Sequence, residues 1–298
     1  MNLRQLRALV EIHETGSLQD ASQRMHVTQS ALSKTIKEFE SEMGVNLLVR
    51  SNKGVLLSEG GLRLLPHARL TLESVRRAQQ DIEDFKGVVV SEINIGVTPV
   101  TAMFPALNEA LIRFQTMHPQ ACLKVQEMRP ANLLQRLRDG LLDFALTSQM
   151  PLTTIGLEWH SLGQLPSALI GRRNHPLRNS RSLRLLQYAN WISADPLADS
   201  QSQLNQLFDG NGLPRPARMM ECTALSLAFQ QVSQTDALMI TCRVNHQDPK
   251  AILPGLDIQE IQVNEPTPDY PINLVCPNSA YLTRSAAALF EMLRYPSH

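Results

Sequence analysis

The sequence predicts a multidomain fold, with an N-terminal all-α winged helix-turn-helix, a long linker helix and a C-terminal α/β region in two lobes. Three observations support this prediction. Two short amphipathic segments meet at a tight turn near residue 27. An apolar stripe at helical spacing follows between residues 59 and 85. From residue 92 onward, short apolar runs alternate with helical segments, a pattern typical of α/β domains.

The first two helices are expected over residues 3–14 and after Ser17, which is a good N-cap residue. The side chains expected to point inward from the first helix are Leu3, Leu6, Leu9, Val10 and His13. Those expected on the packed face of the second are Leu18, Ala21, Ser22 and Met25. His26-Val27 then forms a tight turn. Two helices joined in this way fit either a DNA-binding helix-turn-helix or an ordinary helical hairpin.

The third helix is expected to begin after Thr28 and to run to Met43. Its apolar face is formed by Ala31, Leu32, Ile36, Phe39 and Met43. The opposite face of its first two turns carries Gln29, Ser30, Ser33, Lys34 and Lys37. Amides and hydroxyls can reach base edges in a DNA major groove, while lysines and a helix N-terminus reach phosphates. We therefore predict that these five residues, together with Ser17 and Thr28, contact DNA.

A β-hairpin is expected next, because two apolar runs flank the turn-rich tetrapeptide Ser51-Asn52-Lys53-Gly54. A hairpin after a recognition helix is a wing. Its tip would offer Arg50, Asn52 and Lys53 to phosphate or to the minor groove. The first 62 residues carry as many acidic as basic residues, so DNA binding is indicated by the distribution of charge and not by its sum.

A long helix capped by Ser58 is expected to reach about Phe85, with a bend near Leu62 caused by Pro66. Its apolar stripe at a/d spacing consists of Leu65, Ala68, Leu72, Val75, Gln79 and Ile82. Such a stripe outside a core implies a partner helix, and we expect a dimer. A dimer with two recognition helices predicts an interrupted inverted repeat in the target DNA.

The region after a short hinge at residues 86–91 is expected to be an α/β domain with largely parallel sheets. Strands are expected at 93–97, 123–127, 143–146, 167–170, 191–193, 219–222, 238–241, 258–263 and 272–275. Helices are expected at 99–117, 133–138, up to 233 and at 283–293. The length exceeds what one small sheet needs, so two lobes are expected.

Composition excludes several classes of protein. With 43% hydrophobic and 19% charged residues and no net charge, the chain reads as a soluble globular protein of the cytoplasm, without a membrane span or signal peptide. The four cysteines (Cys122, Cys222, Cys242 and Cys276) form no CxxC pair, and the histidines show no metal-ligand spacing. Neither a metal site nor a cofactor is predicted. Catalytic motifs are missing, so we do not expect an enzyme.

These residues together resemble the LysR-type transcriptional regulators of bacteria over the full length of the chain. The N-terminal resemblance rests on Ala21-Ser22, on residues 28–33 and 36–48, on Arg50 with Gly54, and on residues 57–61. Further landmarks are residues 93–96, 137–146 and 175–177. The chain departs from the family around residues 231–243, where members often carry glycines and a proline.

The resemblance implies a winged helix-turn-helix at 1–58, a dimerisation helix at 59–87 and an effector-binding domain at 91–298. That domain would resemble periplasmic binding proteins, with lobe I at 91–162 and 268–298 and lobe II at 163–267. A small molecule between the lobes would bias a homotetramer, a dimer of dimers, that grips promoter DNA. RNA polymerase is a further candidate partner.

The ligand is expected where strands end and helices begin, as in open α/β sheets. The candidate ligand-binding residues are Thr98, Pro99, Val100, Thr101, Ser148, Gln149, Ser193 and Thr223. The N-terminus at 98–101 would form a small anion site. Because these loops hold no Lys or Arg, we expect neutral donors to hold a small organic acid. Phe104 and Met150 nearby favour an aromatic carboxylate.

Two other functions stay open at this point. A thiol-based redox regulator would use Cys222 and Cys242. A solute-binding receptor would share the α/β domain but has no use for residues 1–57 and needs a signal peptide. The response of DNA binding to an oxidant or to a small acid separates these functions.

Overall fold

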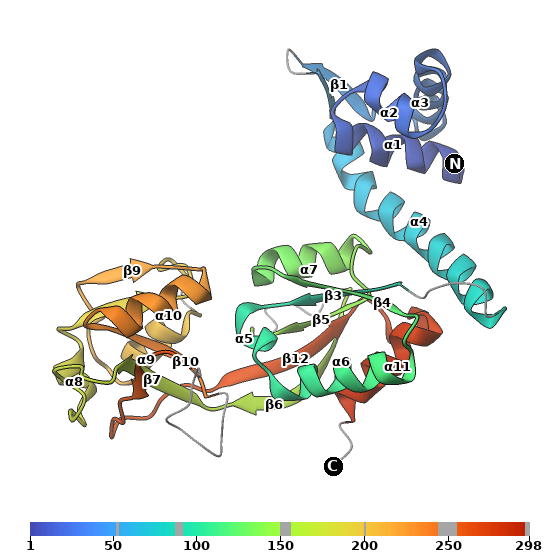
Figure 1. Ribbon diagram of the computed structural model, residues 1–298. Coiled ribbons are helices and arrows are strands. Elements are labelled where there is room, and N and C mark those ends of the chain that lie inside the picture. Colours follow the sequence, from blue (N-terminus) through green and yellow to red (C-terminus); the bar gives the residue numbers. More distant parts are fainter. Residues whose placement is uncertain (52–53, 87–91, 150–155, 200, 244–254, 296–298) are drawn as a thin grey trace.

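The computed structural model describes residues 1–51, 54–86, 92–149, 156–199, 201–243 and 255–295. A small helical domain lies at one end of the molecule, and a single long helix joins it to two α/β lobes placed side by side (Figure 1). Among the described residues, no helix is both long and apolar enough to cross a membrane.

The helical domain is built from three capped helices. Ser17 accepts a hydrogen bond from the backbone of Asp20, and Thr28 accepts one from Ala31 N at 3.2 Å, so both predicted N-caps are confirmed. Gly16 and Gly44 end the first and third helices in the left-handed conformation. The helices are α1 (Leu3–Thr15), α2 (Leu18–Arg24) and α3 (Gln29–Met43).

A compact core fixes the angle between these helices. It contains Ala8, Ile12, Ala21, Leu32 and Ile36, all buried. Some expected core positions are wrong: Leu3, His13 and Met43 are exposed, because α1 and α3 each turn only a narrow face toward this small domain. In the tight turn, His26 adopts a positive φ of 54°.

The predicted hairpin is present as β1 (Leu48–Ser51) and β2 (Gly54–Leu57), which pair antiparallel. The backbone N–H of Val55 donates to Gly16 O, so the hairpin is held against the end of α1. A Cβ at Gly54 would lie 2.6 Å from the same carbonyl oxygen, which requires glycine there. The predicted tip residues of the hairpin, Asn52 and Lys53, lie outside the described residues.

The long helix α4 (Glu59–Phe85) runs through Pro66. The first part of its apolar stripe is not free for a partner, because Leu65 and Ala68 are buried in a core formed with α1, α3 and the hairpin. Further along, Leu72 and Val75 are half-buried and Ile82 is 57% exposed. Only this second part of the stripe is available to another chain.

Lobe I contains a five-stranded mixed sheet of order β4-β3-β5-β12-β6. One face is covered by α6 and α11, and the other by α7. The strands are β3 (Glu92–Val97), β4 (Cys122–Glu127), β5 (Phe144–Thr147), β6 (Glu158–Leu165) and β12 (Tyr270–Cys276). The helices are α5 (Pro99–Ala102), α6 (Pro105–Met117), α7 (Pro130–Arg138), η1 (Ser279–Tyr281) and α11 (Arg284–Arg294).

Lobe II contains a second mixed sheet, of order β11-β7-β10-β8-β9. The helix α10 packs on one face, and α8 and α9 pack on the other. Its strands are β7 (Ser167–Arg172), β8 (Asn190–Ser193), β9 (Met219–Glu221), β10 (Ala237–Cys242) and β11 (Ile258–Glu260). Its helices are α8 (Leu183–Leu186), α9 (Gln203–Gly210) and α10 (Leu225–Gln234).

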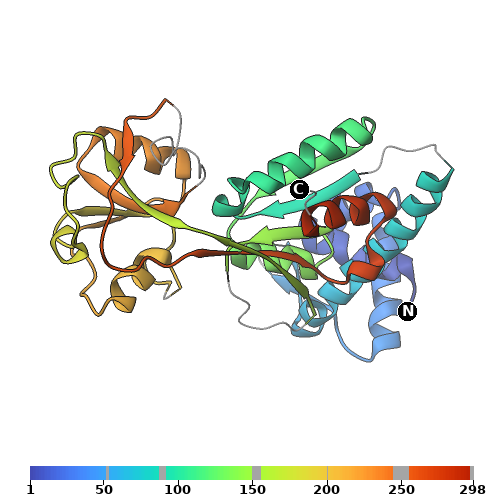
Figure 2. The same cartoon turned by 90° about the horizontal axis from the view of Figure 1, so that it is seen from below.

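Two extended segments connect the lobes: β6 leads into β7, and the chain after β11 returns through β12 (Figure 2). The paired strands β6 and β12 are antiparallel. The expectation of largely parallel sheets is therefore wrong, because each sheet includes strands that arrive from the other lobe. The single helix expected over 99–117 is also wrong. Met103 and Phe104 separate α5 from α6, and Pro105 starts the second helix.

Charged side chains dock α4 on lobe I. Arg69 lies 3.0 Å from Asp139, and Arg77 lies 3.3 Å from Asp143. Asp81 accepts a hydrogen bond from the first backbone N–H of α11, at Arg284. The long helix is thus fixed to the α/β region as well as to the helical domain.

Candidate DNA-binding surface and ligand pocket

The N-terminal half of α3 presents an exposed polar face. Gln29, Ser30, Lys34 and Lys37 are exposed, and Ser33 is half-buried. The buried side chains of the same helix lie on its other face, and they hold it against α1 and α2. The geometry leaves these polar groups free to meet a DNA groove.

Two acidic residues near the end of α3 are engaged elsewhere in the domain. Glu40 accepts hydrogen bonds from the backbone of Leu47 and Leu48, which ties the end of α3 to the hairpin. Glu42 is engaged by the N-terminal ammonium group and by Gln5. Lys34 lies 3.8 Å from Glu38 in an exposed pair, which contributes little and can be exchanged for a phosphate contact. Glu40 and Glu42 are therefore engaged by other parts of this domain.

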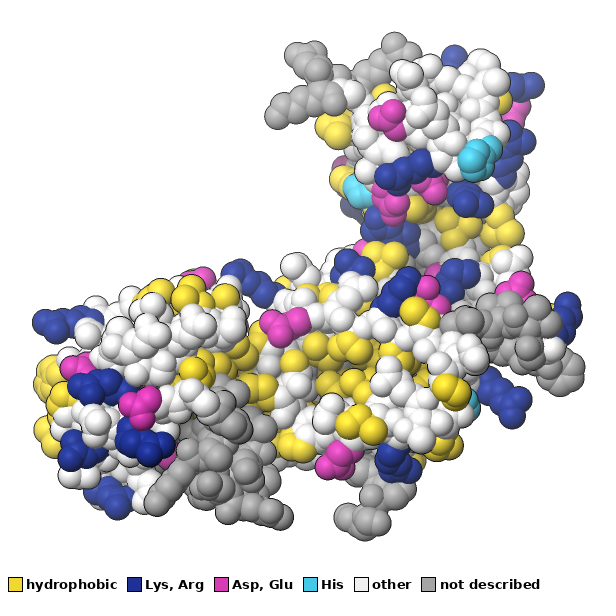
Figure 3. Space-filling model, viewed as in Figure 1, with side chains coloured by type: hydrophobic (Ala, Val, Ile, Leu, Met, Phe, Trp, Pro, Cys, Tyr) yellow, Lys and Arg dark blue, Asp and Glu magenta, His cyan; other side chains and the backbone are white. Residues whose placement is uncertain are grey.

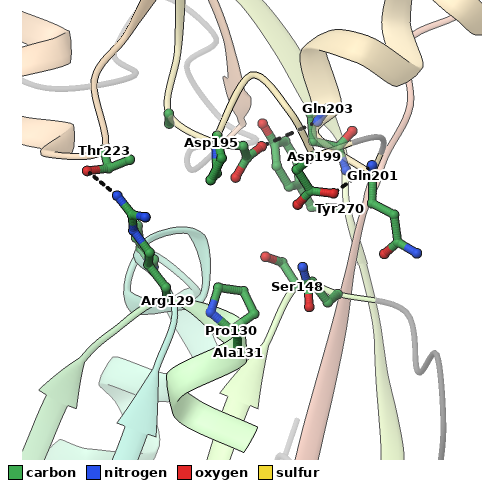
Figure 4. Close-up of a pocket in the computed structure, with 14 residues that line it drawn as sticks. Arg129, Pro130, Ala131, Ser148, Asp195, Asp199, Gln201, Gln203, Thr223 and Tyr270 are labelled. Atoms are coloured by element: carbon green, nitrogen blue, oxygen red, sulfur yellow. Dashed lines mark hydrogen bonds between the residues drawn. The ribbon is translucent and has the colours of Figure 1, made fainter.

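A cavity of about 260 Å³ lies between the two lobes (Figure 4). It is bordered by the ends of the parallel strands β3, β4 and β5 on one side and of β8 and β9 on the other. This is where ligands bind in open α/β sheets. The lining residues are Pro99, Arg129, Pro130, Ala131, Ser148, Gln149, Ala194, Asp195, Pro196, Asp199, Gln201, Gln203, Thr223 and Tyr270.

On the lobe I side, the pocket is positively polarised. Arg129 stands at the N-cap of α7 and points toward Thr223 of lobe II, with Nη2 3.4 Å from the threonine hydroxyl. No side chain caps the first turn of α7, where Pro130 and Ala131 line the pocket. A helix N-terminus and a guanidinium both favour an anion at this corner.

On the lobe II side, the pocket is rich in acceptors. Asp195 accepts one backbone hydrogen bond, from Gln203 at 3.3 Å, and burial together with nearby Asp199 raises the pKa of the Asp195 carboxyl. Gln203 is 6% exposed, and its Oε1 atom is buried without a hydrogen-bond partner in the described structure. Tyr270 is buried behind them.

Of the predicted ligand residues, Pro99, Ser148, Gln149 and Thr223 line the pocket. Ser148 is supported by Thr98, whose hydroxyl oxygen lies 3.4 Å from the serine hydroxyl.

Thr98 and Thr101 themselves do not line the pocket. Thr101 is fully buried, its hydroxyl donates to Leu146 O at 2.9 Å, and it accepts from Thr98 N at 2.9 Å. These two threonines fix the loop after β3. Of residues 98–101, Pro99 lines the pocket, and the anion site expected there stays a prediction.

Three further expectations need correction. Val100 and Ser193 border a separate void of about 20 Å³ next to the pocket. Phe104 packs into the cores below the sheet and does not line the pocket, so it gives no support for an aromatic ligand. Met150 lies outside the described residues. The expected cation-free lining is also wrong, because Arg129 lines the pocket.

Sequence reasoning missed Arg129, Asp195, Asp199, Gln203 and Tyr270. A signal existed for the first two, because Arg129 and Asp195 each follow a predicted strand and precede a proline. The same strand-end criterion that selected Ser148 would have found them.

The cysteines are poorly placed for redox sensing. Cys222, Cys242 and Cys276 are buried, and Cys122 is exposed. Burial raises the pKa of the Cys242 thiol to about 11 and is the main cause that raises that of Cys276 to about 12, so both stay protonated at neutral pH. Glu158, His160 and Cys276 each place one possible metal-ligand atom within 4.8 Å of the others. The Glu158 carboxylate, however, already accepts a hydrogen bond from the backbone N–H of Ser279.

The sequence that forms this helix-turn-helix, long helix and two-lobed pocket matches two known families. Residues 3–62 match the bacterial regulatory helix-turn-helix proteins of the lysR family, and residues 86–295 match the LysR substrate binding domain. The chain belongs to the LysR family. It is a DNA-binding transcriptional regulator with an effector-binding domain, and not an enzyme.

Curated relatives are distant. The transcriptional regulator CfxR of Cupriavidus necator is 26% identical over 266 residues, which cover 89% of this chain and 76% of CfxR. The nitrogen assimilation regulatory protein Nac of Klebsiella aerogenes is 33% identical over 146 residues, covering 49% of this chain and 48% of Nac.

Solved structures show the same fold over the whole chain. CbnR, a LysR family transcriptional regulator, superposes with a TM-score of 0.68 at 22% identity, and the match covers 99% of this chain and 98% of CbnR. Full-length OxyR of Pseudomonas aeruginosa, as the C199D variant, gives a TM-score of 0.68 at 21% identity with the same coverage.

Proposed function

We propose that the regulator binds promoter DNA through α3 and the wing, and that a small organic acid between the lobes modulates this binding. The observation that carries the proposal is the cavity lined by both lobes, with Arg129 and the start of α7 on one side. A ligand that contacts both lobes stabilises one lobe arrangement over another. The docking of α4 on lobe I gives such a change a route to the helix-turn-helix.

The proposed DNA contacts are Ser17, Thr28, Gln29, Ser30, Ser33, Lys34, Lys37, Arg50, Asn52 and Lys53. The exposed polar face of α3 supports this set, and CbnR, which has the same fold, has been crystallised with its target DNA. Gln29 and Ser33 would read base edges, while the lysines and the wing would contact phosphates.

We further propose that two chains pair through α4. A groove between α1 and α4 supports this pairing, since apolar side chains border it, beside basic ones, where the stripe on α4 is only half-buried. Hydrophobic side chains are exposed between the helical domain and the lobes (Figure 3). The apolar side chains that border the groove are Leu3, Val10, Met25, Val27, Leu72 and Val75. A dimer of this kind would recognise an interrupted inverted repeat, and a dimer of dimers would place the chain in a homotetramer that acts in the cytoplasm.

The test is a thermal-shift screen of the full-length protein against small carboxylates, aromatic ones included. DNA sites that the protein selects from a random library are then footprinted in the presence of any carboxylate that binds the protein. We expect stabilisation by at least one acid, lost in Ser148→Ala, and protection of an inverted repeat. Binding that is unaffected by changes at Ser148, Gln149 and Thr223 would place the ligand elsewhere.

A further inference from the structure

The pocket between the lobes has charges of opposite sign at its two ends, and we infer that its ligand is a zwitterion of the α-amino acid type. The carboxylate would face Arg129 and the start of α7, and the ammonium group would face Asp195, Asp199 and Gln203. This inference rests on the proposed function and goes beyond it, because a simple organic acid satisfies only one end of the pocket.

The lobe II end has acceptors that are not fully satisfied. Asp195 and Asp199 each accept a backbone hydrogen bond, from Gln203 and Gln201, and none of the ion pairs in the described part of the chain includes either of them. The Oε1 atom of Gln203 is buried without a partner within the same described residues. A buried acceptor without a donor is costly, and two neighbouring carboxylates add repulsion. A protonated amine supplies the missing donors and the opposite charge together.

The lobe I end lacks an acceptor. Arg129 is exposed, and within the described parts of the chain its guanidinium has only the Thr223 hydroxyl as a hydrogen-bond partner, at 3.4 Å. The first turn of α7 adds backbone N–H groups that no side chain caps. A carboxylate at this corner can accept from both, as anions do at helix N-termini.

The size and the remaining lining favour a small body between the two charges. At about 260 Å³, the cavity is slightly smaller than the range of about 300–1,000 Å³ typical of small-molecule sites. The apolar part of its lining includes Pro99, Pro130, Ala131, Ala194 and Pro196, and Ser148 points a hydroxyl into it. A zwitterion with a short apolar side chain matches this surface.

Matched probes test the inference by calorimetry on the full-length protein. Each set has one apolar body: L-leucine with 4-methylpentanoate and 3-methylbutylamine, and L-phenylalanine with 3-phenylpropanoate and 2-phenylethylamine. In at least one set, we expect the amino acid to bind with a Kd at least tenfold below those of both singly charged analogues. A carboxylate that binds as tightly as its amino acid would overturn the inference while leaving an acid effector in place.

Two variants assign the ends of the ligand. Arg129→Gln should weaken binding of the amino acid and the carboxylate but not that of the amine. Asp195→Asn should weaken binding of the amino acid and the amine but not that of the carboxylate. The exposed pair Arg215→Gln and Asp209→Asn, on the surface of lobe II, provides matched controls that should change nothing. If both pocket variants weaken all three probes equally, or if no amino acid binds, the inference is wrong.

Discussion

The guanidinium of Arg77 in α4 lies 3.3 Å from the carboxylate of Asp143, which directly precedes β5 of lobe I. Both side chains are buried, at 9% and 2% exposure. Arg77 also contacts Glu73 and donates to Leu142 O, while Asp143 accepts from Asn94 N at 2.8 Å. The linker helix and the effector-binding domain are therefore joined by charges that are shielded from water.

Removing one partner of this pair should be strongly destabilising. Arg77→Leu leaves the Asp143 carboxylate buried without its cation. Burial already raises the pKa of this carboxyl, and Arg77 opposes that rise, so the substitution should raise the pKa further. We expect a loss of about 3–5 kcal/mol in the free energy of unfolding, measured by urea denaturation. The neighbouring Arg76→Leu is the control, because Arg76 is 42% exposed and should contribute at most about 1 kcal/mol. Adding Asp143→Asn to Arg77→Leu should restore part of the loss, and equal effects at Arg76 and Arg77 would contradict the account.

The recognition helix gives a prediction about DNA specificity. Gln29→Ala or Ser33→Ala should weaken binding to the selected site by about 1–3 kcal/mol and leave binding to scrambled DNA unchanged, because we propose that these side chains read base edges. Lys34→Ala should instead weaken binding to both DNAs and reduce the salt dependence. Fluorescence anisotropy at several salt concentrations separates the two effects. Variants at Gln29 and Ser33 that discriminate as wild type does would refute this role.

The proposed pairing of two chains through α4 can be tested at the exposed part of its apolar stripe. Val75→Asp and Ile82→Asp should shift the full chain from dimer or tetramer toward monomer in analytical ultracentrifugation, because they place charge in an apolar seam. Leu185→Asp, at an equally exposed position of lobe II (58%), should leave the mass unchanged. An unaltered mass for both α4 variants would show that the seam is not the interface.

Thr101 and Ser148 should behave differently, although the sequence suggested ligand binding for both. Thr101→Val removes a buried hydroxyl that donates to Leu146 O, and it should cost about 1–3 kcal/mol of stability by thermal unfolding. Ser148→Ala should leave stability nearly unchanged and lower ligand affinity. A stable Thr101→Val variant with weakened binding would return Thr101 to the pocket.

The burial of Asp195 predicts that the stability of the protein depends on pH. Its folded-state pKa is raised by burial above the ordinary value of 3.8, so protonation favours the folded state. Its contribution to stability is fully present below that ordinary value and is lost as the pH rises through the raised folded-state pKa. Asp195→Asn does not titrate, so the ligand-free variant should gain stability relative to wild type as the pH rises from about 4 toward neutrality. A constant difference across this range would contradict a raised pKa.

The sequence predicted the helical domain well because its signals are local. Ser17 and Thr28 cap helices by contacts within three residues, and the spacing of Leu32, Ile36 and Phe39 follows the helix itself. The pocket depends on contacts between distant segments. Thr98 and Thr101 follow a strand just as Ser148 does. They are buried because β5 packs beside β3, which the local sequence does not show.

The strand-end criterion selects Arg129 and Asp195 one at a time, but it does not show that they border the same cavity. That depends on how the two lobes pack, because the two residues lie far apart in the chain. Pro105 did carry a local signal, because a proline inside the expected 99–117 helix predicts an interruption there.

The most direct test of the account is a DNA-binding titration with and without the ligand. The selected site is titrated with full-length protein, alone and with the tightest-binding amino acid of the probe sets at saturation. We predict that the amino acid changes the Kd for DNA by about fivefold or more, or changes the footprint, in wild type but not in Asp195→Asn. An amino acid that saturates the pocket while the Kd and the footprint stay the same would contradict the claim that this pocket controls DNA binding.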